Sequence, residues 1–196
     1  MAGELHIGHL IAGSDALKVK TIMANSQASV DLDLRRALVE SYAVNERMNQ
    51  MVLAHLNPAA WRAKLPGSKG RTIAAIFVHV HNVRRKWLRL SAPHLKMPAA
   101  LERSSCTQVQ VRDALAESGE RCCEMLAEAE SFRRDGWAKP WPAGAAMAAY
   151  MITHDAHHRG QVCMLAHQLG FPLPVEVGAG VWAWEKLLQA KEKPSS

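Results

Sequence analysis

Apolar side chains recur at helical intervals in four long segments of the chain, and turn residues separate the segments. The segments run from 31 to about 57, from 72 to about 90, from 107 to about 132 and from 145 to 169. The second shows the clearest spacing, with apolar positions four, three, four and three residues apart: Ile76, Val80, Val83, Trp87 and Leu90. Each segment therefore predicts an amphipathic helix with one face toward a shared core.

The ends of these helices also carry sequence signals. Asp31 and Thr72 are suited to cap the first two helices, and Gly170 suits the left-handed residue that ends the fourth. Residues 171–180 are predicted as a loop, and residues 181–190 as a short terminal helix. No alternating apolar segment is long enough to indicate a strand. We expect an all-α protein, an antiparallel four-helix bundle with a short extra C-terminal helix.

The first 28 residues differ from the rest. They contain three glycines and no sustained helical period, so they are predicted to form an N-terminal arm outside the core. Residues 29–196 then form a single bundle domain, which is long enough to bury a core without disulfides.

Cysteine usage and hydropathy indicate a soluble cytoplasmic protein. The four cysteines lack the Cys-x-x-Cys spacing of a zinc or redox site, and we expect them to be reduced thiols. No stretch approaches the roughly 20 apolar residues of a membrane span. Charged residues interrupt the first thirty positions, where a signal peptide needs an unbroken apolar stretch.

The net charge of +6 and the pI near 9.4 raise the question of a nucleic-acid partner. The basic residues form only short scattered pairs, such as Arg35-Arg36 and Arg133-Arg134, without interleaved aromatic residues. This distribution does not favour nucleic-acid binding and is equally suited to a pocket for a small anionic molecule.

A histidine pair carries the chemistry of the fourth helix. His154 and His158 are four residues apart, so both lie on one helical face, together with Met147 and Met151. Buried histidines with ordinary hydrogen-bond partners are the alternative interpretation. A pair at this spacing inside an apolar stripe favours a metal site, provided that another helix supplies a third nitrogen.

The second helix offers two histidines for this role. At about 100° per residue, His79 lies at the edge of the apolar face, whereas His81 is turned toward Arg84, Arg85 and solvent. We therefore predict His79 as the third ligand of one divalent ion, zinc, nickel, cobalt or iron. Three neutral imidazoles leave a coordination position for water or substrate, as in catalytic sites.

Several of these features resemble the DinB-like (YfiT-like) family of metal-binding four-helix bundles over roughly residues 30–188. They are His79 followed by Trp87-Leu88, the run from His154 to Gln161, the Gly170-x-Pro172 exit, and Trp182 and Trp184. The resemblance implies metal ligands at His79, His154 and His158, and a homodimer. The chain departs from the family at Arg84 or Arg85, where the family usually has an acidic residue. This departure bears on the choice of substrate.

The resemblance also implies an activity. Some members of the family are thought to transfer a low-molecular-weight thiol to a small electrophilic substrate. A divalent ion suits this chemistry because it lowers the pKa of a bound thiol. We expect His157 to relay a proton or orient water, unless it is simply a surface histidine. Arg159 and Gln161 are expected to contact the ligands or an anionic substrate group; an interhelical ion pair is the alternative for Arg159.

Two other functions fit the same residues. His154-Asp155-x-x-His158 imitates the His-Glu-x-x-His motif of metal-dependent hydrolases, in which the acid is the general base. A non-catalytic, stress-related bundle would instead use the ion only to tie two helices together.

Overall fold

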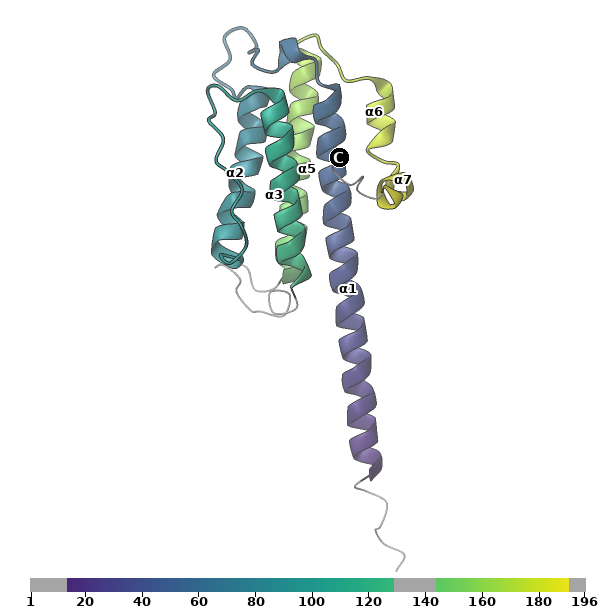
Figure 1. The fold of residues 1–196 in the computed structure, drawn as a ribbon. Helices are drawn as coiled ribbons and strands as arrows, with labels where there is room; N and C mark the ends of the chain where they lie inside the picture. The colour runs from purple at the N-terminus through teal and green to yellow at the C-terminus, as the bar shows by residue number, and fades with distance from the viewer. Residues whose placement is uncertain (1–13, 129–143, 191–196) are drawn as a thin grey trace, which may run out of the picture.

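The computed structural model describes residues 14–128 and 144–190 and confirms the all-α class (Figure 1). The long helices are α1 (Ser14–His55), α2 (Ile73–Ser91), α3 (Gln108–Ala127) and α5 (Gly144–Gln168). The short ones are the 3₁₀ turn η1 (Pro58–Ala60), α6 (Val175–Gly180) and α7 (Trp184–Gln189). The described ranges contain no strand, and none of their helices is long and apolar enough to cross a membrane.

The four long helices form a bundle in which α3 and α5 each contact both α1 and α2. The connection over residues 92–107 runs back along α2, where Arg85 donates to the Pro98 carbonyl (2.9 Å) and His81 pairs with the Ala99 carbonyl (2.8 Å). Consequently α3 begins at the same end of the bundle as α2 and runs parallel to it (Figure 1). Antiparallel packing holds for α2 against α5, the pair of helices that carries the candidate site.

Capping fixes the ends of the helices largely as the sequence predicts. The Thr72 hydroxyl accepts a hydrogen bond from the Ala75 amide (3.2 Å) and confirms the start of α2. At the end of α5, Gly170 has a φ of 83°, and its amide donates to the His167 carbonyl (3.0 Å). A left-handed glycine thus ends α5 and directs the chain toward α6.

Three predicted boundaries are wrong. Asp31 lies inside α1, because no glycine or proline interrupts the chain from Ser14 to His55, and the N-terminal half of α1 projects beyond the bundle (Figure 1). Residues 175–180 form α6 rather than a loop, since Val177 is buried against the bundle. Residues 181–183 separate it from α7, so the predicted terminal helix is shorter.

The third helix also differs from expectation, ending at Ala127, after which Glu128 has extended backbone angles. Its predicted end near residue 132 and the connection through Pro140-Trp141-Pro142 lie outside the described residues.

Most predicted core positions are buried, including Ile76, Val80 and Trp87 on α2. Leu90 is 51% exposed, whereas Leu88 and Ser91 are buried, so the Leu90 side chain lies on the side of this turn that faces away from the core.

Candidate metal centre

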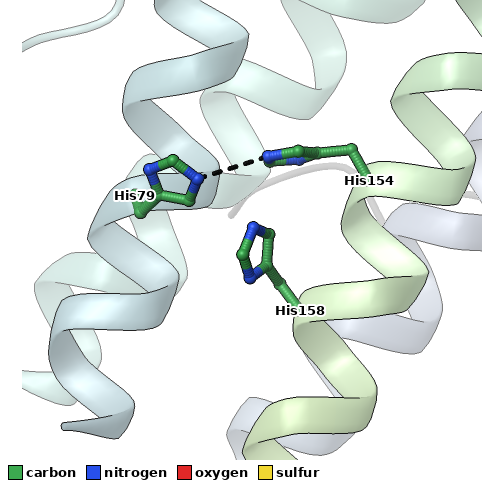
Figure 2. Close-up of side chains that lie close together, drawn as sticks. All are labelled: His79, His154 and His158. Carbon is green, nitrogen blue, oxygen red and sulfur yellow. Dashed lines mark hydrogen bonds between the residues drawn. The ribbon is translucent and has the colours of Figure 1, made fainter. Parts of the chain in front are cut away.

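His154 and His158 lie one turn apart on α5 and face His79 on α2 (Figure 2). A nitrogen from each ring can be chosen so that all three lie within 4.8 Å of one another. The Nε2 atoms of His79 and His154 are 3.4 Å apart, and the ring centres of His79 and His158 are 4.7 Å apart. The structure therefore brings together the three residues that the spacing selects.

The separation of the His79 and His154 nitrogens fits the geometry of a shared ion. Two nitrogens bound at about 2.0–2.1 Å to a tetrahedral ion lie about 3.4 Å apart, which is the distance between His79 and His154. His158 is buried, whereas His79 and His154 are half-buried, so the cluster lies between core and solvent. The three histidines are thus suited to hold a divalent cation.

Gln161 orients the buried ligand. Its Oε1 atom lies 2.8 Å from Nδ1 of His158, and an amide oxygen can only accept, so Nδ1 carries the proton. This tautomer leaves the lone pair of His158 Nε2 available to a cation. The amide nitrogen of Gln161 donates to Nε2 of the exposed His157 at 2.9 Å, so His157 connects to the cluster through Gln161.

The surroundings of His79 and His158 favour the neutral imidazole, which is the form that binds metals. Burial, followed by the charges on His158 and Arg71, lowers the pKa of His79 from 6.5 to about 4. Burial also lowers the pKa of His158, although its hydrogen bond to Gln161 opposes this shift. Protons therefore compete weakly for His79 and His158 near neutral pH.

A family model described as the DinB family matches residues 23–177. The chain belongs to the DinB family. The matched residues include all three histidines but exclude Trp182 and Trp184. The match begins at residue 23, whereas the resemblance begins at about residue 30. No curated protein and no solved structure gives a significant match.

Beneath the histidines, the DinB bundle contains a buried network of charges. Asp155, next to His154, accepts from Arg84 at 2.5 Å through Oδ2, while its Oδ1 lies 3.5 Å from Nδ1 of His154. Arg84 also pairs with Glu46 of α1 (2.5 Å). Burial alone would raise the pKa of Asp155, but the Arg84 charge and the hydrogen bonds from His154 and Arg84 together hold this pKa below its usual value. The Asp155 carboxylate therefore supports His154 and points into the core.

Two residues of α2 that were expected to face solvent are fully buried. His81 is 0% exposed, and its ring pairs with the Ser118 hydroxyl (3.2 Å) and the Ala99 carbonyl. Arg84 is 1% exposed and also donates to the Leu115 carbonyl (2.9 Å). The prediction that this side of α2 is solvated is wrong, because α3 and the returning connection cover it.

A pocket of about 520 Å³ opens onto the histidine cluster. Its lining residues are Arg71, Ile76, His79, His157, His158, Gln161 and Leu165. Sequence reasoning missed Arg71, which is exposed and has no hydrogen-bond or ion-pair partner within the described ranges. The only available signal was its place just before the Thr72 cap, two turns ahead of His79. Arg71 supplies positive charge to the pocket.

Arg159 lies elsewhere in this DinB-family protein. Its Nη1 atom donates to the side-chain oxygens of Asn45 (2.9 Å) and Asn49 (2.8 Å) on α1. It lines a different pocket, on the α1 side of α5, and is absent from the lining of the histidine pocket. The structure thus brings His157 and Gln161 to the metal centre but not Arg159.

Proposed function

We propose that this DinB-family protein is a divalent-metal-dependent transferase that joins a low-molecular-weight thiol to a small electrophilic carbon compound. The observation that carries this proposal is the convergence of three imidazole nitrogens from α2 and α5 beside an open pocket, which His79 and His158 line. Three protein ligands leave a cation able to accept a further ligand, as catalytic sites require. The chemistry that a bound divalent ion supplies is to lower the pKa of a thiol, which makes the thiolate available near neutral pH.

The chain's own residues have separate roles in this proposal. His79, His154 and His158 hold the ion, and Gln161 fixes the orientation of His158. His157 lies on the pocket wall, and its Nε2 atom takes the proton that the thiol releases in exchange for the hydrogen bond from Gln161. The sulfur then forms a bond to the electrophilic carbon, and the leaving group departs with its electron pair.

Arg71 gives the pocket a preference for anions. Its charge lies close enough to lower the pKa of both His79 and His158, and no acidic residue lines the pocket. We assign it to a carboxylate of the thiol or of the acceptor. This arrangement suits a thiol that carries a carboxylate better than an uncharged one.

The position of Asp155 gives no support to the hydrolase alternative. A general base must reach a water on the ion, but the Oδ2 atom of Asp155 accepts from Arg84, Asn45 and Asn49 in the core. Replacing Asp155 by asparagine would disturb this buried network, so its effect on activity would not separate hydrolysis from thiol transfer.

Metal content tests the first part of the proposal. We expect protein purified without added metal to contain about one divalent ion per chain, and His158→Ala to lose it. His167→Ala is a matched control, because His167 is exposed on the same helix and outside the cluster. Folded His81→Ala should still contain about one ion per chain. The variant should be less stable by about 2–4 kcal/mol, because the substitution leaves a cavity and an unpaired Ala99 carbonyl.

Turnover tests the second part. With 1-chloro-2,4-dinitrobenzene as acceptor, a panel of thiols should give conjugates that absorb light, and both a chelator and His158→Ala should abolish the enzymatic rate. Arg71→Gln should raise KM at least about tenfold for carboxylated thiols and leave KM for 2-mercaptoethanol unchanged. Metal retention without turnover of any thiol would contradict the transferase and support the non-catalytic bundle. Metal in His158→Ala at the wild-type level would remove the site itself.

A further inference from the structure

A second and larger pocket, of about 760 Å³, lies on the opposite side of α5 from the histidines. It is formed by α1, by α5 and by the chain from Pro172 to Trp184, which includes α6. On α5 its lining includes Ala156, Arg159 and Cys163, a different face from that of His154 and His158. Its volume is within the range of about 300–1,000 Å³ that is typical of small-molecule sites.

The walls of this pocket are mainly apolar and remain accessible. They include Val175, which is 80% exposed, Trp182, which is 79% exposed, and Trp184, which is 42% exposed. Apolar side chains of this size that gather around a concave surface are characteristic of a binding site rather than of ordinary protein surface. A molecule that binds in this pocket must therefore bury a substantial apolar part.

A positively charged side chain, that of Arg159, lines this apolar pocket in a fixed orientation. Arg159 is held through Nη1 by the side-chain oxygens of Asn45 and Asn49, and the amide groups of both asparagines donate to Asp155. Arg159 has no ion-pair partner in the described part of the chain, and no aspartate or glutamate lines the pocket. The neutral amides therefore fix the guanidinium without neutralising it, and its other donors remain available.

We infer that this pocket binds a free amphipathic carboxylate, whose head group pairs with Arg159 and whose tail of about eight to twelve carbons lies against the tryptophans and valines. Charge complementarity with Arg159 selects a carboxylate over a neutral lipid of the same length. The pocket is separate from the one at the metal centre, since the two share no lining residue.

Calorimetric titration with octanoate and with octanol tests this inference. Octanoate should bind at least about tenfold more tightly than octanol. Arg159→Gln should remove this difference by weakening octanoate alone. His79→Ala, on α2 and outside the network that holds Arg159, should leave octanoate affinity unchanged, so failure of the transferase proposal and failure of this one can be told apart.

Gly160 provides a second variant that does not depend on charge. It lines the pocket, and a Cβ added there meets nothing within 4 Å, so Gly160→Leu can fold normally while its side chain fills the cavity. We expect this variant to lose binding of both octanoate and octanol. Equal affinity for the two ligands, undiminished binding by Gly160→Leu, or no binding by the wild type would overturn the inference. If the wild type binds no octanoate but forms a dimer, and Gly160→Leu is monomeric, then a second copy of the chain occupies the pocket instead.

Discussion

Individual histidines in this protein owe their roles to the helix that each one faces. His79 and His81 are two residues apart on α2, yet His79 meets the histidines of α5, whereas His81 pairs with Ser118 of α3. Both rings have a lowered pKa, chiefly because of burial. Their difference therefore lies in the available partners: His79 has other imidazoles, and His81 has ordinary hydrogen-bond partners.

The low pKa of His79 predicts a pH dependence of stability for the metal-free protein. His79 titrates near 6.5 when unfolded and at about 4 when folded, so between these values the unfolded state binds more protons. Stability should be fully present above pH 6.5 and decline as the pH falls toward 4. After a discount for solvent screening, we expect this loss to be on the order of 1 kcal/mol.

Urea unfolding in a chelator at pH 7 and pH 5 would measure this effect. His79→Gln removes one titrating group, so its stability should fall less than that of the wild type over the same interval. A parallel decline in the two proteins would show that His79 does not contribute to the pH dependence.

Among the elements, α1 and α3 approach closely at Gly119. A Cβ on this residue would lie 2.8 Å from Cγ of Glu46 and 3.4 Å from Nη1 of Arg84. Glu46 cannot easily move away, because Arg84 and Gln50 hold its carboxylate. A glycine in the middle of α3 is therefore needed to admit the buried ion pair beneath the site.

This close approach predicts opposite effects for the same substitution on two helices. Gly119→Ala should destabilise the protein by about 1–3 kcal/mol, since overpacking outweighs the gain in helix propensity. Gly160→Ala, where the added Cβ meets open space, should stabilise it by about 0.5–1 kcal/mol. Chemical unfolding of both variants checks the pair, and a stabilised Gly119→Ala would contradict the proposed crowding.

At the scale of the whole molecule, the candidate metal centre joins two helices that are distant in sequence. Between α2 and α5 lie the returning connection and α3, so an ion held by both α2 and α5 would restrain a large part of the fold. Because the unfolded chain does not hold its histidines in this geometry, the ion should bind the native state preferentially.

The melting temperature should therefore depend on the metal. An ion at a hundred times its Kd adds about 2.7 kcal/mol, which corresponds to a rise of about 5–10 °C for a chain of this length. Scanning calorimetry with ion and with chelator should show this difference in the wild type and none in His158→Ala. An equal shift in the variant would indicate that the ion binds elsewhere.

Residue spacing alone is enough to predict the features that depend on one helix. The paired positions of His154 and His158, the Thr72 cap and the Gly170 exit all follow from interactions within a few residues, so they can be inferred without a partner helix. The edge position of His79 follows in the same way from its angle to the apolar stripe. The family resemblance reaches the same three histidines.

Other features depend on contacts between distant segments. The parallel course of α3, the burial of His81 and Arg84, the place of Arg71 at the pocket and the turn of Arg159 toward α1 all result from packing. Helical periodicity gives the angle between side chains on one helix, but it does not say which element covers each face. Only the tertiary contacts decide whether a polar side chain meets solvent, an ion pair or a pocket.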